Sequence, residues 1–239
     1  STLRLDRNEG TFLLPPAPRE ELRQLVGSLD FHLPPDPQAR ELRRTLGRSL
    51  RVSPEALLPF NHQGECLSRI RLSFPTPPRV LLLESSSPCA ERIASWGGEI
   101  RRFSLTLRGE ELAFDEERFL DEMARFSPQV VYLDCPNDPT GFRIPGATLA
   151  RLASLCPSAS FFVVDESYGE FAEETTLPLF QKGRAPKRLV ALRSFAYAWG
   201  LSALQAGYAL LGDEARARLE TLPMEPLDGL NQSGDHEAQ

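Results

Sequence analysis

The sequence predicts an α/β protein, a three-layer α/β/α sandwich with a mostly parallel sheet. Three observations lead to this prediction. From about residue 53 onward, short apolar runs alternate with amphipathic helical patterns. Several of these runs are apolar almost throughout, which is typical of parallel strands covered on both faces. The length of 239 residues is also sufficient to bury one large core.

The order of the elements divides the chain into three parts. Two amphipathic helices are expected at 19–29 and 37–50, joined by a proline-rich connection. Strands are expected at 79–83, 99–105, 129–133, 161–164, 188–192 and 207–211, and helices between them at 88–96, 115–126, 145–155 and 213–222. We therefore expect an N-terminal arm and helix pair at 1–52, a large α/β domain at 53–225, and a polar tail at 226–239.

Composition excludes several classes of function. The chain carries 27 Lys and Arg against 33 Asp and Glu, and this acidic balance argues against nucleic acid as a partner. No apolar run approaches the length of a membrane span. The four cysteines are widely spread and indicate reduced thiols in a cytoplasmic protein. The three histidines form no cluster with them, so no metal site is expected.

Polar segments follow three successive strands of the expected sheet. These segments are residues 134–141, 165–168 and 193–197. The carboxyl ends of parallel strands meet at one edge of a sheet, where ligands of such folds bind. The sequence therefore predicts a binding crevice formed by these three loops.

The same loops resemble a known family. Residues 137–141 read N-D-P-T-G, residues 163–171 read V-V-D-E-S-Y-G-E-F, and residues 192–201 read L-R-S-F-A-Y-A-W-G-L. Together with L-D-R-N-E at 5–9, they resemble the fold-type I pyridoxal-phosphate enzymes of the histidinol-phosphate aminotransferase and threonine-phosphate decarboxylase branch. The resemblance implies a transferase large domain, a pyridoxal phosphate cofactor and a dimer that closes over the crevice.

The chain departs from the family where the cofactor would be held. The lysine that forms the Schiff base falls on Tyr197, and a phenol cannot form an imine. Two positions of the phosphate cup fall on Ala196 and Gln205, which carry no charge. Each charged hydrogen bond lost from a phosphate removes about 1.5–3 kcal/mol. We therefore expect no bound cofactor, with non-covalently held pyridoxal phosphate as the alternative.

The positions that contact the cofactor ring are only partly retained. Asp165, which pairs with the pyridinium nitrogen in the family, and Tyr168 are present, whereas Asp138 stands where the family has asparagine. These three are expected to be vestigial ring contacts; the alternative is that Asp165 and Tyr168 form a surviving site. Tyr197 is interpreted as a plug that refills the vacated space, and the alternative is a new acid or base.

These observations lead to a functional hypothesis with one alternative. The chain is expected to be a degenerate aminotransferase homologue that acts by binding, as a homodimer or as the partner of an active relative. The alternative is an enzyme that uses the crevice for acid–base chemistry on a small phosphorylated or carboxylate metabolite. The sequence stops near the point where the family's C-terminal small domain begins, so that domain is expected to be missing or truncated.

Overall fold

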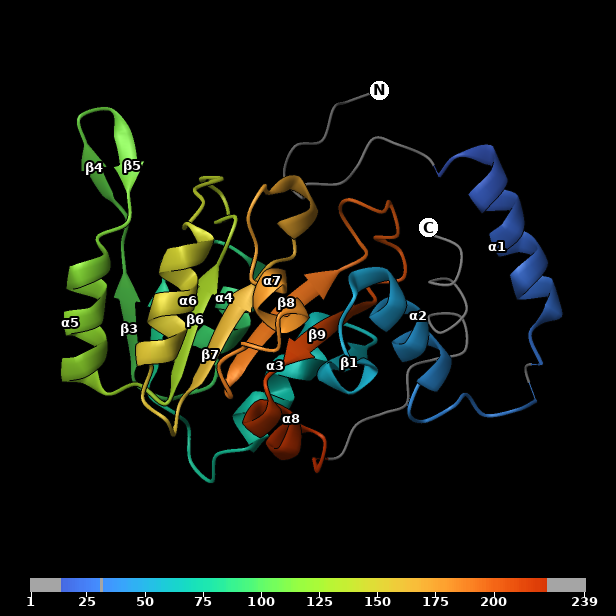
Figure 1. The fold of residues 1–239 in the computed structure, drawn as a ribbon, viewed down its shortest axis with the longest axis horizontal. Helices are drawn as coiled ribbons and strands as arrows, with labels where there is room; N and C mark the ends of the chain where they lie inside the picture. Colours follow the sequence, from blue (N-terminus) through green and yellow to red (C-terminus); the bar gives the residue numbers. More distant parts are fainter. Residues whose placement is uncertain (1–13, 31, 223–239) are drawn as a thin grey trace.

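The computed structural model describes residues 14–30 and 32–222. The L-D-R-N-E segment at 5–9 and the predicted tail at 226–239 lie outside these residues. A twisted sheet runs through the middle of the molecule, with helices on both of its faces (Figure 1). This arrangement is the expected three-layer sandwich.

Within the described residues, the central sheet contains seven strands in the order β1-β9-β8-β7-β6-β2-β3. The strands are β1 (Leu57–Phe60), β2 (Val80–Leu83), β3 (Ile100–Phe103), β6 (Val130–Asp134), β7 (Phe161–Asp165), β8 (Leu189–Ser194) and β9 (Gly207–Leu211). Strand β9 is antiparallel to both of its neighbours, and the remaining pairs are parallel. The sheet is therefore mostly parallel, as predicted, and β6, β7 and β8 end side by side.

Helices bury both faces of this sheet. The helices are α1 (Pro16–Ser28), α2 (Arg40–Leu50), α3 (Gln63–Leu72), α4 (Pro88–Ala94), α5 (Glu116–Phe126), α6 (Gly146–Leu155), α7 (Leu177–Gln181) and α8 (Asp213–Leu219). Apolar side chains of α3, α4 and α8 pack on one face of the sheet, and those of α5 and α6 pack on the other. Helix α2 continues this second layer over β1 and β9.

The structure contains elements that the sequence patterns did not reveal. Strand β1 contains Pro59, which lowers the strand propensity of the segment but is tolerated because β1 lies at the edge of the sheet. Helix α3 follows it directly and has a weak amphipathic pattern. A separate hairpin of β4 (Thr106–Arg108) and β5 (Glu111–Ala113) turns at Gly109, whose φ of 67° favours glycine.

Polar side chains fix the starts of two helices. Asp115 accepts a hydrogen bond from the backbone N–H of Arg118 and caps α5. Asp36 accepts hydrogen bonds from the backbone N–H groups of Gln38 and Arg40, at 3.1 and 3.0 Å. This local turn explains why α2 begins at Arg40 rather than at the predicted residue 37.

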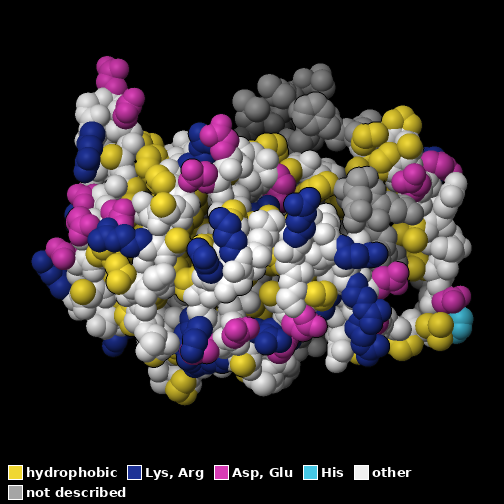
Figure 2. Space-filling model, in the orientation of Figure 1, with side chains coloured by type: hydrophobic (Ala, Val, Ile, Leu, Met, Phe, Trp, Pro, Cys, Tyr) yellow, Lys and Arg dark blue, Asp and Glu magenta, His cyan; other side chains and the backbone are white. Residues whose placement is uncertain are grey.

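The surface of the molecule is mixed in charge. Figure 2 shows basic and acidic side chains interspersed over the face in view. Helix α1 has no buried residue and stands apart from the sheet (Figure 1). None of the helices within residues 14–30 and 32–222 is both long enough and apolar enough to cross a bilayer.

Candidate functional site

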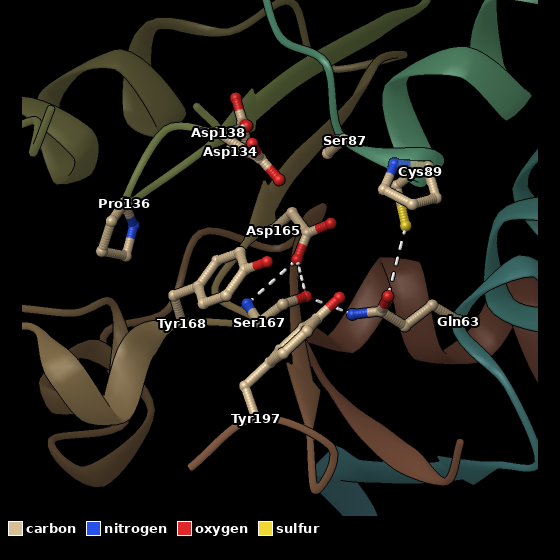
Figure 3. A pocket seen from close by; sticks show the side chains of 11 residues that line it. Gln63, Ser87, Cys89, Asp134, Pro136, Asp138, Asp165, Ser167, Tyr168 and Tyr197 are labelled. Atoms are coloured by element: carbon tan, nitrogen blue, oxygen red, sulfur yellow. Dashed lines mark hydrogen bonds between the residues drawn. The ribbon is translucent and has the colours of Figure 1, made fainter. Parts of the chain in front are cut away.

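A polar cavity lies at the carboxyl ends of β6 and β7, where the three predicted loops come together (Figure 3). The starts of α3 and α4 close its other side. Its volume is about 20 Å³. The cavity is lined by Gln63, Ser87, Pro88, Cys89, Asp134, Pro136, Asp138, Asp165, Ser167, Tyr168 and Tyr197.

Asp165 lies at the end of β7, and both of its carboxylate oxygens accept hydrogen bonds from within the chain. The Tyr132 hydroxyl donates to Oδ2 at 2.8 Å from the neighbouring strand β6. The backbone N–H of Ser167 donates to Oδ1 at 3.0 Å, and the Ser167 hydroxyl donates to the same oxygen. Asp165 is only 4% exposed, so these donors replace the water that its carboxylate would otherwise bind.

The hydrogen-bond network continues away from Asp165 to the two helix starts. The Gln63 side-chain amide donates to the Ser167 hydroxyl, and the Cys89 thiol donates to the Gln63 carbonyl oxygen at 3.4 Å (Figure 3). Burial, and then the charge of Asp165, raise the pKa of the Cys89 thiol well above its usual range. Cys89 is therefore a protonated donor in this network and a poor nucleophile at neutral pH.

Two tyrosines form the wall of the cavity opposite α4. Tyr168 follows β7 and Tyr197 follows β8, and their rings stack with centroids 4.3 Å apart and an interplanar angle of 25°. Both hydroxyl groups point toward Asp165 and Ser167 (Figure 3). Burial raises the pKa of Tyr197, a hydrogen bond with Tyr168 lowers it, and the charge of Asp165 raises it further.

The loop after β6 contributes a second buried carboxyl group. Asp134 is 3% exposed and accepts hydrogen bonds from the Ser85 hydroxyl at 2.5 Å and from the Asn137 amide at 2.9 Å. The backbone N–H of Asp138 also donates to it, at 2.8 Å. Burial outweighs these three hydrogen bonds and raises the pKa of Asp134 to about 6.

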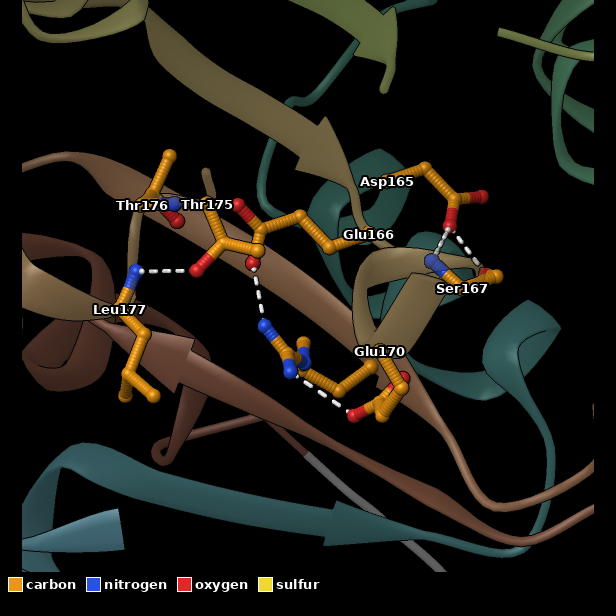
Figure 4. Close-up of polar contacts among 8 residues, drawn as sticks. Asp165, Glu166, Ser167, Glu170, Thr175, Thr176 and Leu177 are labelled. Atoms are coloured by element: carbon orange, nitrogen blue, oxygen red, sulfur yellow. Dashed lines mark hydrogen bonds and ion pairs between the residues drawn. The ribbon is translucent and has the colours of Figure 1, made fainter. Parts of the chain in front are cut away.

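A different network lies on the opposite side of the same strand end (Figure 4). Glu166 is fully buried and accepts hydrogen bonds from the Arg193 guanidinium at 2.8 Å and from the backbone N–H of Thr176. Arg193 also pairs with Glu170 at 2.8 Å. Burial lowers the pKa of Arg193, but Glu166, Tyr208 and Glu170 together outweigh that effect and raise the pKa above its usual range, so the guanidinium remains charged.

Four of the six predicted site residues meet at the cavity. Asp138, Asp165, Tyr168 and Tyr197 all line it, whereas Ala196 and Gln205 do not. Ala196 donates its backbone N–H to the Ser194 hydroxyl. Gln205 is exposed and has a left-handed backbone with φ of 55°.

Neither lysine of the chain lines the cavity. Lys187 lies before β8, where its ammonium group pairs with Glu214 at 3.4 Å. Lys182 follows α7 and is exposed. Both therefore precede the strand whose opposite end carries Tyr197, as the sequence order predicts.

Sequence reasoning missed two residues of the Asp165 network, Tyr132 and Cys89, whereas Ser167 lies in the predicted loop 165–168. Strand parity could have found Tyr132, because it pairs with Val163 and therefore shares a sheet face with Asp165. Within residues 14–30 and 32–222, no group of three or more His, Cys, Asp or Glu side chains is placed to hold a metal ion.

The parallel strands, the crossover helices and the cavity at the strand ends define the class of this protein. It is a doubly wound α/β protein with its site at the carboxyl edge of the sheet. The chain belongs to the aminotransferase class I and II family, whose model matches residues 5–224.

Curated relatives at moderate identity are histidinol-phosphate aminotransferases. The chain is 29% identical over 211 residues to the enzyme of Caldanaerobacter subterraneus subsp. tengcongensis, covering 88% of this chain and 58% of the relative. It is 31% identical over 206 residues to histidinol-phosphate aminotransferase 1 of Carboxydothermus hydrogenoformans, covering 86% and 57%. The chain thus spans less than two thirds of the length of these relatives.

Solved structures of the same kind share the fold. Histidinol-phosphate aminotransferase from Sinorhizobium meliloti in complex with pyridoxal-5'-phosphate aligns with a TM-score of 0.82 at 22% identity, covering 97% of this chain and 62% of that one. L-threonine-O-3-phosphate decarboxylase from Porphyromonas gingivalis aligns with a TM-score of 0.75 at 23% identity, covering 93% and 67%. The predicted fold of a pyridoxal-phosphate-dependent transferase is confirmed.

Proposed function

We propose that this chain is a degenerate aminotransferase homologue that acts by binding, as a regulatory or dimer-partner subunit in the cytoplasm, and that it does not catalyse transamination through a lysine-bound cofactor. The observation that carries this proposal is Tyr197. It occupies the wall of the cavity at the position where the family pattern has the Schiff-base lysine, and its ring stacks on Tyr168.

The residues around the cavity do not fit pyridoxal phosphate. Both oxygens of Asp165 already accept hydrogen bonds from Tyr132 and Ser167, so the partner of a pyridinium nitrogen is engaged. The cavity volume of about 20 Å³ is close to the room that one water molecule needs. The described residues that line it include three aspartates and no Lys or Arg to hold a phosphate dianion.

The proposed partner is a second copy of this chain or an active relative. This part of the proposal is supported by the resemblance to the family, which implies a dimer that closes over the crevice. Analytical ultracentrifugation of the pure protein, alone and mixed with an active histidinol-phosphate aminotransferase, tests this part. The expected result is a dimer of the pure protein or, in the mixture, a species with the combined mass of one copy of each chain. A monomer of this chain in both samples would contradict it.

Borohydride reduction after incubation with pyridoxal phosphate tests the loss of lysine chemistry. The two lysines give a simple readout by peptide mass spectrometry. We expect no stoichiometric pyridoxyl adduct on Lys182 or Lys187 and no stable absorbance of a bound aldimine. An active histidinol-phosphate aminotransferase treated in parallel is the positive control. A stoichiometric adduct on either lysine would overturn the proposal.

A second candidate function has one observation in its favour. Asp165, Tyr168 and Tyr197 line one cavity, so three groups capable of acid–base chemistry face the same small space. This candidate is an enzyme acting on a small phosphorylated or carboxylate metabolite, with or without non-covalent pyridoxal phosphate. Its test is a turnover screen in which the Asp165→Asn variant loses an activity that the unaltered chain has. The acidic lining makes it the weaker candidate, because it repels anionic substrates.

A further inference from the structure

The ring of Tyr197 makes the kind of stacking contact that a bound aromatic ligand would make. It stacks on Tyr168 with centroids 4.3 Å apart, within the range of favourable aromatic pairs. Its hydroxyl is directed into the cavity, toward the groups around Asp165 (Figure 3). Tyr197 reaches this place from the loop after β8, and not from the strand itself.

Little space remains beside this ring. The residual cavity of about 20 Å³ has room for roughly one water molecule, so a second ring does not fit beside Tyr197. The surrounding polar atoms do not depend on an external ligand, because Asp165 is bonded by Tyr132 and Ser167, and Ser167 by Gln63. With Tyr197 in place, Asp165 and Ser167 are therefore hydrogen-bonded within the chain.

The chemistry of the lining selects an uncharged ring. Three carboxyl side chains, Asp134, Asp138 and Asp165, line the cavity and would repel a phenolate, a carboxylate or a phosphate. Burial raises the pKa of Tyr197, and nearby carboxylates add to the effect, which keeps its hydroxyl protonated at neutral pH. A protonated phenol can donate a hydrogen bond here, whereas a phenolate cannot.

We infer that the crevice is a binding site for an uncharged phenol ring, and that Tyr197 supplies this ring from the same chain. The inference deepens the proposed function, because it rests on the absence of lysine chemistry at this position. It also states the ligand class that the site takes once the tyrosine is removed: small neutral phenols, and not phosphorylated or carboxylate molecules.

Complementation of a deleted ring tests this inference. Engineered cavities in protein cores bind small aromatic molecules of matching size. We expect Tyr197→Gly to lower the thermal midpoint, and 4-methylphenol, which is the deleted side chain, to raise it again in a saturable manner. Toluene should bind roughly fivefold more weakly, because it lacks the hydroxyl group. 4-Methylbenzoate should not bind, and the unaltered protein should bind none of the three.

Control variants distinguish binding of 4-methylphenol in the cavity from a nonspecific effect on a destabilised protein. Trp199→Gly removes an aromatic ring from the same loop at a position that is 40% exposed and does not line the cavity. It should not respond to 4-methylphenol. Tyr197→Phe keeps the ring and should also remain unresponsive. If Tyr197→Gly does not fold, Tyr197→Ala refolded with and without 4-methylphenol gives the same readout as a yield of native protein.

The outcomes distinguish this inference from the proposed function. If 4-methylphenol neither stabilises Tyr197→Gly nor raises the refolding yield of Tyr197→Ala, the inference is wrong, while a negative borohydride result still supports the binding role. Binding of 4-methylbenzoate as tight as that of 4-methylphenol would also overturn it. A pyridoxyl–lysine adduct in the unaltered protein would instead overturn the proposed function.

Discussion

Asp165 and Glu166 are consecutive residues at the end of β7, yet they belong to two different networks. Successive strand residues point to opposite faces, so Asp165 faces the cavity and Glu166 faces the packed side under α7. Both are nearly completely buried, at 4% and 0% exposed. Glu166 is paired with the guanidinium of Arg193, whereas Asp165 is bonded by hydroxyl and amide donors.

The difference shows two ways of burying a carboxylate. An ion pair with Arg193 holds the fully buried Glu166 carboxylate in place, which suits a structural role. Neutral donors satisfy Asp165 without a cation, and they leave a small polar cavity next to it. The first network supports the sheet, and the second lines the small cavity beside Tyr197.

The largest expected loss of stability follows from breaking the buried ion pair between Arg193 and Glu166. Arg193→Leu leaves the buried Glu166 carboxylate without its cation, and we expect a loss of about 3–5 kcal/mol in the free energy of unfolding. Urea unfolding followed by circular dichroism measures it. The double variant Arg193→Leu with Glu166→Gln should recover part of the loss, because the unpaired charge is removed. A loss below about 1 kcal/mol would contradict the expectation that the buried ion pair contributes more to stability than a single neutral donor.

Asp134 provides a pH test on the cavity side. Its pKa is raised from 3.8 in the unfolded chain to about 6 in the folded protein. Below about pH 4 the carboxyl group is protonated in both states, so its titration does not change the free energy of unfolding. As the pH rises, the unfolded chain ionises first and the folded protein is destabilised, and this effect is complete above about pH 6. A shift of this size corresponds to about 3 kcal/mol.

Asp134→Asn removes this titration. Relative to the unaltered protein, the variant should gain up to about 3 kcal/mol between pH 4 and pH 7, less the cost of any hydrogen bond that the amide cannot make. Urea unfolding at a series of pH values measures the difference between the two proteins. Asp213→Asn, at an exposed helix start, is the matched control. A pH-independent difference would show that Asp134 does not titrate in this range.

Removal of one neutral donor should have a smaller effect. Tyr132→Phe leaves Oδ2 of Asp165 without its hydroxyl donor, and we expect a loss of about 1–3 kcal/mol in the free energy of unfolding. The double variant with Asp165→Asn completes a double-mutant cycle that isolates the interaction between the two side chains. Additive losses would indicate that the hydroxyl and the carboxylate do not interact.

The smallest effect is expected at an exposed ion pair. Arg151 on α6 pairs with Glu116 and Glu117 on α5, and its side chain is 49% exposed. Solvent and salt screen such pairs, so Arg151→Ala should leave the urea midpoint within experimental error. This variant removes an arginine–glutamate pair just as Arg193→Leu does, but at the surface. A loss as large as that of Arg193→Leu would show that burial is not what distinguishes the two pairs.

Much of the fold could be predicted from patterns within single segments. The continuous apolar runs around 130–134 and 161–165 identified buried strands, because parallel strands covered on both faces carry few polar residues. Strand β1 was missed because Pro59 interrupts its pattern. The residues around Trp199 follow a helical pattern that would place this side chain in the core, but Trp199 is 40% exposed and lies in a loop without helical structure.

The sequence by itself determined the class of fold, the edge of the sheet where a site would lie, and the side chains that the loops after β6, β7 and β8 bring there. Only the tertiary structure decided how those side chains are satisfied. Tyr132 reaches Asp165 across 33 positions of sequence, and Gln63 reaches Ser167 across 104. Such contacts depend on strand order and on where helices begin, and no local pattern encodes the distance between two atoms brought together by packing.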